Sequence, residues 1–168
     1  MIDWELDDEH TAIQDAAHKF AQSEIAPLAR DVDLEERGFP EDLLKKMAAQ
    51  GYFGMGIGVE QGGLGSGTLA MGLVTEEFCR ASLAMGSIVQ RNWLCGHILD
   101  NFGTSEQKKR WLPGLSSGAL QSATSGTEPD AGSDAANIKT RAQLDGDCYV
   151  VNGAKQWTTF AGRADLLF

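Results

Sequence analysis

The spacing of apolar residues changes once along this chain of 168 residues. Up to Leu112, apolar side chains recur every three or four positions, which is the period of helices that pack one face against a core. From Ile138 onward they alternate with polar side chains, which is typical of a half-buried strand. Helices followed by strands predict an α+β fold, with a helical domain over residues 1–119 and a β domain over residues 120–168.

Five helical segments are predicted in the first part of the chain. They cover residues 7–31, 40–51, 69–80, 83–102 and 104–112. Pro27 should kink the first segment or split it in two, because proline removes a helical hydrogen bond and its ring crowds the preceding turn. Thr104 and Gln107 form a capping box that opens the last segment, and Pro113-Gly114 is expected to close it.

Two segments resemble catalytic motifs but lack the structural setting that those motifs need. The glycine-rich stretch 54–67 contains no Gly-x-Gly-x-x-Gly and no following Gly-Lys-Ser/Thr, so we interpret it as a loop. Residues 114–118 fit the Gly-x-Ser-x-Gly pattern of a nucleophile elbow, which requires a strand before the serine and a later histidine. Here a helix precedes, and the last histidine is His97, so we interpret this segment as a helix-to-strand turn.

The β part should form an antiparallel hairpin followed by further strands. A strand over 138–144, a turn at 145–147 and a return strand over 148–151 are predicted, and Asn152-Gly153 should turn the chain into a third strand over 155–160. Residues 164–168 begin a fourth. These strands leave open sheet edges, so the chain is expected to be the N-terminal part of a longer polypeptide or a subunit that a partner completes.

Composition disfavours several classes of function. The net charge is −10, and no stretch concentrates Lys and Arg strongly, which argues against nucleic acid or an anionic membrane as a partner. The three cysteines are widely spaced and the three histidines are isolated, so neither a disulfide framework nor a metal site is predicted. The segment 1–4 does not begin a secretory signal, and no apolar run reaches the roughly 20 residues of a membrane span, which predicts a cytoplasmic protein.

Several side chains in the helical part are interpreted as structural. Glu76 and Glu77 are adjacent, and neighbours on a helix point about 100° apart, so they should not face one substrate together. We expect both to lie on a solvated helix edge. Trp93 and Phe102 are expected in the core, although the helix that carries Trp93 also has the character of a pocket wall.

Two short segments carry the groups expected of a ligand site. Residues 127–134, Thr-Glu-Pro-Asp-Ala-Gly-Ser-Asp, combine small side chains, which expose backbone N–H groups, with the hydroxyls of Thr127 and Ser133. Such groups hold the polar edge of a flat heterocycle and an adjoining phosphate. Residues 153–159, Gly-Ala-Lys-Gln-Trp-Thr-Thr, add the indole of Trp157 and two more hydroxyls.

In this order and at this spacing, the two segments resemble the TEPxAGSD and GxKxWIT motifs of the acyl-CoA dehydrogenase family. Gly62-Gly63-Leu64-Gly65 is similar to the family's YGGLG stretch, and residues 102–108 are similar to FGTEEQK. The resemblance covers essentially the whole chain. It implies an N-terminal α-helical domain followed by the beginning of an antiparallel β-barrel domain.

The resemblance also implies that the chain binds FAD. The residues that match the family's flavin-contacting positions are Thr124, Ser125, Gly126, Thr127, Gly132, Ser133, Trp157, Thr158 and Thr159. By the resemblance, Trp157 packs on the flavin, Thr127 and the two following threonines bond its ring, and Gly132 and Ser133 meet phosphate. Ser133 also lies near the pantetheine arm of the substrate.

The implied reaction is α,β-dehydrogenation of an acyl-CoA thioester, with an electron-transfer flavoprotein as partner and a homotetramer as the assembly. The family's catalytic Glu falls beyond Phe168, so no catalytic residue is assigned within this chain. Glu128 is not expected to substitute for it, because the turn that holds it serves structure. An acyl-CoA oxidase or flavin monooxygenase of the same fold remains open, as does a non-catalytic helical partner subunit.

Overall fold

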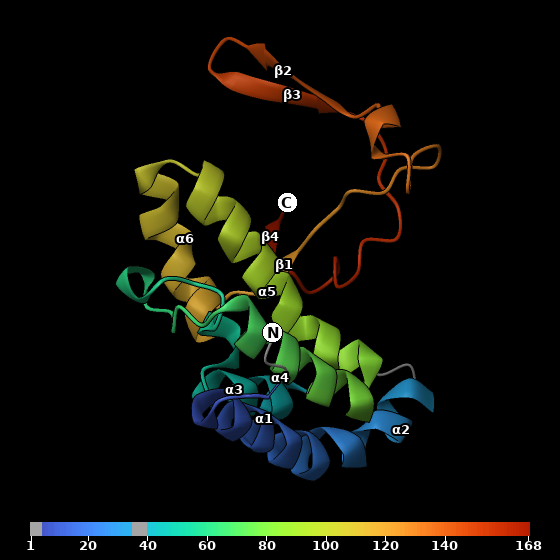
Figure 1. The fold of residues 1–168 in the computed structure, drawn as a ribbon. Coiled ribbons are helices and arrows are strands. Elements are labelled where there is room, and N and C mark those ends of the chain that lie inside the picture. The colour runs from blue at the N-terminus through green and yellow to red at the C-terminus, as the bar shows by residue number, and fades with distance from the viewer. Residues whose placement is uncertain (1–4, 35–39) are drawn as a thin grey trace. The chain divides into compact units, whose positions relative to one another are not determined.

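The computed structural model describes residues 5–34 and 40–168, so the N-terminal segment 1–4 lies outside the described residues. The chain divides into two compact units, Met1–Gln121 and Ser122–Phe168. The first unit is helical and the second carries the strands (Figure 1). This division agrees with the predicted α+β class.

The helical unit contains six α-helices and three short turns among its described residues. The α-helices are α1 Asp8–Phe20, α2 Ala26–Leu34, α3 Glu41–Ala49, α4 Thr68–Ala81, α5 Leu83–Phe102 and α6 Ser105–Ser117. The short turns are a π-helical turn η1 Ala21–Ile25 and two 3-10 turns, η2 Tyr52–Gly54 and η3 Val59–Gln61. The glycine-rich stretch between α3 and α4 therefore forms turns and loop, as predicted.

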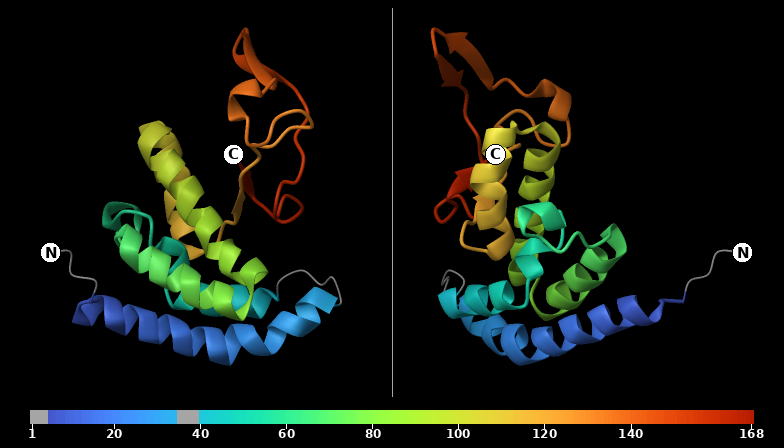
Figure 2. Two further views of the ribbon diagram at one scale, coloured as in Figure 1. Left: turned by 45° about the vertical axis from the view of Figure 1, so that its right-hand side comes forward. Right: turned by 90° about the vertical axis from the view of Figure 1, so that its left-hand side faces the viewer.

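The interruption predicted at Pro27 takes the form of the wider turn η1, which joins α1 to α2. The N–H of Ala26 donates to the carbonyl of Ala21, five residues back, in place of the usual four. The altered turn thus ends at Ile25, two residues before Pro27, which cannot continue the normal hydrogen-bond ladder. Figure 2 shows α1 and α2 following one another as a continuous, bent rod.

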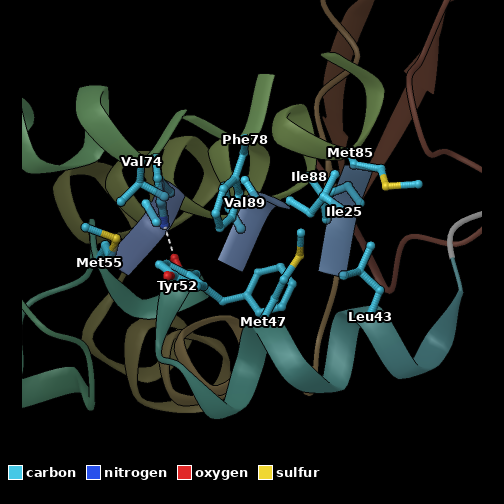
Figure 3. Packing of buried hydrophobic residues seen from close by; sticks show 14 of the residues in the cluster. Ile25, Leu43, Met47, Tyr52, Met55, Val74, Phe78, Met85, Ile88 and Val89 are labelled. Atoms are coloured by element: carbon cyan, nitrogen blue, oxygen red, sulfur yellow. Dashed lines mark hydrogen bonds between the residues drawn. The ribbon is translucent and has the colours of Figure 1, made fainter. Parts of the chain in front are cut away.

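The core of the helical unit lies between α1, α3, α4 and α5. Leu43 and Met47 of α3 are buried and face Ile25, Phe78 and Val89 (Figure 3), so the helix predicted over 40–51 packs apolar side chains on the core. Three rings, Phe20, Tyr52 and Phe78, pack with centroids 4.8 to 5.5 Å apart. Trp93 is buried as expected, and its indole N–H donates to the carbonyl of Tyr52 at 2.6 Å.

The predictions for the end of α6 and for Phe102 are wrong. Helix α6 does not close at Pro113-Gly114 but continues to Ser117, and Gly118 ends it with φ 74°. Burial of Leu112 and Leu115 favours this continuation, because the lost hydrogen bond of one proline is offset by apolar contacts on the core side. Phe102, expected in the core, is 85% exposed, because it is the last residue of α5.

Residues 114–118 consequently lie at the end of a helix and not in a helix-to-strand turn. The hydroxyl of Ser116, the serine of the Gly-x-Ser-x-Gly pattern, donates to the carbonyl of Gly62 at 2.6 Å. This bond attaches the glycine-rich loop to α6, so the serine has a structural role.

The second unit contains four short strands and one 3-10 turn. The strands are β1 Ser122–Ala123, β2 Arg141–Asp145, β3 Cys148–Asn152 and β4 Leu166–Leu167, and the turn is η4 Ala135–Asn137. Strands β2 and β3 form the predicted antiparallel hairpin, with Arg141 opposite Asn152 and Gly146 at φ 65° in the turn. Strand β4, the predicted fourth strand, pairs in parallel with β1, which the sequence did not indicate.

Two predictions for the strands are wrong. Strand β2 is exposed along its whole length, and not half-buried, because within this unit nothing packs on either face of the hairpin. The third strand over 155–160 does not form. Trp157 and Phe160 have φ values of 59° and 71°, which turn the backbone out of the extended conformation that a strand needs.

Candidate functional site

The segment after β1 forms a tight bend, which comprises residues 125–133. The backbones of Glu128 and Ala131 exchange two hydrogen bonds, 2.8 and 3.2 Å long, which close a turn around Pro129-Asp130. Proline and aspartate are favoured in such turns for their fixed φ and their side-chain acceptor. The bend is further fixed at its end, where Asn137 donates to the carbonyl of Asp130.

The bend and the stretch before Trp157 lie side by side. The hydroxyls of Ser125 and Thr158 are 2.6 Å apart, which is a hydrogen bond. The N–H of Gln156 donates to the carbonyl of Thr127 at 3.0 Å. Two segments about 30 residues apart in sequence, predicted to act together, are therefore joined directly.

Trp157 is held in an unusual conformation next to this junction. Its side chain is 82% exposed, and its φ of 59° lies in the left-handed region that favours glycine. A non-glycine residue there costs on the order of 1–3 kcal/mol and persists only when its surroundings fix it. The exposed indole gains little by burial in its own unit, so its aromatic face is available for contact with a ligand or another part of the protein.

The other residues of the predicted site are placed less closely. Thr124 precedes the bend and is partly buried, whereas Gly126, Gly132, Ser133 and Thr159 are exposed. At Gly126 and Gly132 an added Cβ would meet no other atom within 4 Å, so the backbone there is open to a ligand. The hydrogen bonds that join the two segments come from residues 125–128 and 155–158, and Gly132 and Ser133 lie further along the bend.

Glu128 has a structural role in the bend, as the sequence analysis expected. Its carboxylate accepts the backbone N–H groups of Lys139 and Thr140 at 2.7 and 2.9 Å and pairs with Lys155 at 2.9 Å. Hydrogen bonding by Thr140, by the N–H of Lys139 and by Lys155 lowers the pKa of Glu128 to about 2. A carboxylate stabilised in its charged form is a poor proton acceptor.

The helical unit contains a groove between the outward faces of α4 and α5. It has a volume of about 390 Å³ and is lined by Gly56, Thr68, Met71, Gly72, Thr75, Gln90, Trp93, Leu94 and His97. The α4 residues recur at spacings of three and four, so they share one helix face. From the sequence, only the helix of Trp93 was predicted to have the character of a pocket wall. The i, i+3, i+4, i+7 spacing of Thr68, Met71, Gly72 and Thr75, which places two threonines, a methionine and a glycine on one helix face, is a sequence signal that could have indicated the groove.

Glu77 is buried, which contradicts the prediction of a solvated edge for both carboxylates. It is 3% exposed, because α1 packs across this face of α4, whereas Glu76 is exposed. Its carboxylate bonds Nδ1 of His18 at 2.8 Å and Arg80 at 3.1 Å. The bond to His18 is the main cause that lowers the pKa of Glu77, and the charge of Arg80 adds to it. The ion pair of Glu77 with His18 therefore joins α4 to α1. Glu76 and Glu77 do not form an acid-base dyad, because one is exposed and the other is buried.

The described part of the chain contains neither a candidate metal cluster nor a helix that could span a membrane. Among residues 5–34 and 40–168, no group of His, Cys, Asp and Glu side chains is arranged to hold a metal ion. Within the same residues, none of the helices has both the length and the apolar character that crossing a membrane requires.

Comparison with protein-family models gives two matches that together cover most of the chain. Residues 7–119 match the acyl-CoA dehydrogenase N-terminal domain, and residues 123–168 match the acyl-CoA dehydrogenase middle domain. Among curated proteins, the NADH-dependent acryloyl-CoA reductase of Anaerotignum propionicum is 39% identical over 168 residues, which is 99% of this chain and 42% of that protein.

Solved structures give the same result. The glutaryl-coenzyme A dehydrogenase glutaryl-CoA complex matches 99% of this chain and 43% of its own, with a TM-score of 0.91 and 34% identity. A glutaryl-CoA dehydrogenase from Mycobacterium smegmatis in complex with FADH2 matches 96% of this chain and 42% of its own, with a TM-score of 0.90 and 29% identity. The chain spans less than half the length of the relatives that it matches. These matches in sequence and in fold show that the chain belongs to the acyl-CoA dehydrogenase family.

Proposed function

We propose that the protein uses FAD to dehydrogenate an acyl-CoA thioester between Cα and Cβ, and that residues 124–159 bind the flavin. The observation that carries this proposal is the junction of the bend with the Trp157 stretch. At that junction the bonded hydroxyls of Ser125 and Thr158 lie beside an exposed indole in a strained backbone. Family membership supports it, and so does a neighbour solved in complex with FADH2.

The residues present fit a large planar cofactor with a polar edge. Trp157 offers an uncovered aromatic plane, and Thr127, Thr158 and Thr159 offer hydroxyls near it. Gly132 has an open backbone, and Ser133 adds a hydroxyl for a phosphate oxygen. Bound FAD would supply the acceptor for the hydride that leaves Cβ. The task of these side chains is to orient the ring and to keep water from its face.

We further propose that the acyl chain lies in the groove between α4 and α5. Met71 and Trp93 line the groove and suit an alkyl chain, and at Gly72 an added Cβ would meet no other atom within 4 Å, which leaves room for the chain. Thr75, Gln90 and His97 add polar groups at the same groove. A polar group on the acyl chain would find partners there.

No catalytic base is assigned to this chain. Glu128 is unsuited because its charged form is fixed by three donors, and Glu77 is unsuited because it is buried against α1. The relatives are more than twice as long, so we propose that the proton acceptor at Cα comes from another part of the complete protein or its assembly.

A second candidate function is the reverse reaction, in which a flavin donates the hydride to an enoyl-CoA. The similarity to an acryloyl-CoA reductase favours it. The same bend and indole would serve either direction, because positioning of the ring does not depend on which way the hydride moves. An electron-transfer flavoprotein as partner, a homotetramer and a cytoplasmic location stay predictions.

The deciding experiment uses the protein in its full natural length. FAD should be released on denaturation, and the bound flavin should be bleached by a saturated acyl-CoA in the absence of air. Reduced flavin that persists in air until an electron-transfer flavoprotein is added identifies a dehydrogenase, and reoxidation within seconds identifies an oxidase. Bleaching by NADH with reduction of enoyl-CoA identifies the reductase. A protein that binds no FAD would overturn all three and leave the non-catalytic alternative.

A further inference from the structure

The ion pair between Glu128 and Lys155 is a largely buried charged contact of the strand-bearing unit, and the proposed flavin contacts do not use it. The side chain of Glu128 is 5% exposed and that of Lys155 is 27% exposed, although the segments that carry them lie at the surface. A pair held out of water in this way is costly unless every remaining bond is satisfied. Here the carboxylate has three donors, so it is satisfied.

Lys155 and its neighbour Gln156 attach to three consecutive residues of the bend. The ammonium of Lys155 bonds both the Glu128 carboxylate and the carbonyl of Gly126, the latter at 3.1 Å. The N–H of Gln156 donates to Thr127, and its side-chain amide donates to the carbonyl of Glu128 at 3.2 Å. The stretch before Trp157 is thus fixed at four points.

The next two residues in the chain are Trp157, with its left-handed backbone, and Thr158, which bonds Ser125. A strained residue keeps its conformation only when its neighbours leave it no alternative. The bonds of residues 155 and 156 are the constraint closest to Trp157 on its N-terminal side. The carboxylate also accepts from Lys139 and Thr140, so it connects the base of the β2–β3 hairpin to the same point.

We propose that Glu128 and Lys155 are positioning residues for the flavin, which act by fixing the bend against the stretch that presents Trp157 and Thr158. Neither side chain need touch the cofactor. Loss of either partner removes the charged part of this anchor and leaves only the bonds of Gln156 to the backbone of the bend, so the indole and the Thr158 hydroxyl no longer meet the ring in one arrangement. This inference rests on the proposed function, because it assigns a role at the proposed flavin site.

The test compares two lysine variants in the protein of full natural length. Lys155→Met removes the pair with Glu128, and Lys139→Met removes an exposed pair, 2.8 Å long, with Asp130 of the same bend. Both changes delete one lysine charge next to a carboxylate, but the Lys139 side chain is 64% exposed and its backbone bond to Glu128 is kept. FAD affinity of the apo-protein is measured together with visible circular dichroism of the bound flavin, which reports the surroundings of the ring.

We expect Lys155→Met and Glu128→Gln each to weaken FAD binding roughly ten- to a hundredfold, as for loss of a charged hydrogen bond in a buried setting. At saturating FAD, both variants should change the circular dichroism of the flavin. Lys139→Met should change the FAD affinity by no more than about threefold and should keep the circular dichroism of the parent. Lys155→Arg, which keeps the charge, should recover most of the affinity. The variant that combines Lys155→Met with Glu128→Gln should lose no more FAD affinity than the weaker-binding single variant, because the two side chains act as one unit.

The inference is overturned if Lys155→Met binds FAD as the parent does, if Lys139→Met loses as much, or if the flavin spectrum at saturation stays that of the parent. If Lys155→Met does not fold, Glu128→Gln takes its place under the same criteria, and Lys155→Arg stays the variant that is expected to bind FAD nearly as the parent does. A parent protein that binds no FAD instead contradicts the proposed function, so the two failures are distinguishable.

Discussion

At the scale of single residues, Trp157 combines two features that a purely structural residue does not need. Its indole is exposed, so the unit gains little apolar burial from it, and its backbone is strained. The sequence motif predicted an aromatic plane at this position, but it predicted a strand around it. The left-handed conformation was not predictable, because Trp-Thr-Thr has high strand propensity and only the contacts of residues 155 and 156 with the bend override it.

The exposed indole leads to a prediction in which binding and stability separate. Trp157→Leu should weaken FAD binding by about 1 kcal/mol or more, roughly fivefold upward, because an aromatic contact is lost. The thermal midpoint of the apo-protein should stay within about 2 °C, since the side chain makes little contact there. Fluorescence titration and calorimetry check the two halves. A fall in apo stability with unchanged FAD affinity would show that Trp157 is a core residue of the complete protein.

At the scale of elements, the helices were predictable where local signals agree with packing. The bounds of α5, Leu83–Phe102, match the prediction because a capping serine and a terminal glycine flank an apolar run. The end of α6 was not predictable, because Pro113 and Gly114 are local stop signals that burial of Leu115 overrides. Burial of Glu77 likewise depends on α1, which lies about 60 residues away in sequence.

The groove between α4 and α5 predicts the effect of filling it. A side chain at Gly72 would meet no other atom at its Cβ, so Gly72→Leu should fill the groove without harming the fold. Helix propensity even favours the change by up to about 1 kcal/mol. We expect the KM for the longer acyl-CoA substrates to rise roughly tenfold, with FAD content unchanged, in steady-state assays of the full-length protein. Ala84→Leu, at an exposed position of α5 outside the groove, is the matched control.

The contact between α1 and α4 gives a prediction with a pH dependence. Glu77→Gln should lower the free energy of unfolding at pH 7 by about 1–3 kcal/mol, because the buried carboxylate loses its charged bonds to His18 and Arg80. The folded state lowers the pKa of Glu77, so its contribution is present above the ordinary value of about 4.3 and is lost as the pH falls through the folded value.

The difference between parent and Glu77→Gln should therefore shrink as denaturant titrations move from pH 6 to pH 3. The neighbouring Glu76→Gln, at an exposed position, serves as control and should change stability by less than about 0.5 kcal/mol at either pH. A constant difference across this pH range would mean that the ionised form of Glu77 is not what stabilises the contact.

At the scale of the whole molecule, the two candidate sites lie in different units. The flavin residues belong to Ser122–Phe168, and the groove belongs to Met1–Gln121. The order of a helical and a β part was predictable from periodicity, since it depends on patterns within short windows. The parallel pairing of β1 with β4 was not, because it joins Ser122 to Leu166 and leaves no local signal.

This division predicts that two ligands protect two separate regions from amide hydrogen exchange. In the full-length protein, FAD should protect residues 124–133 and 155–159, because a ligand at a hundred times its Kd suppresses opening of its site by about 2.7 kcal/mol. An acyl-CoA added to the holoprotein should further protect the groove faces at 68–75 and 90–97. Helix α1, which lines neither site, is the internal reference and should exchange at the same rate in all three states. Protection by FAD confined to the helical unit would contradict the flavin assignment, whereas acyl-CoA protection absent from α4 and α5 would contradict only the assignment of the groove.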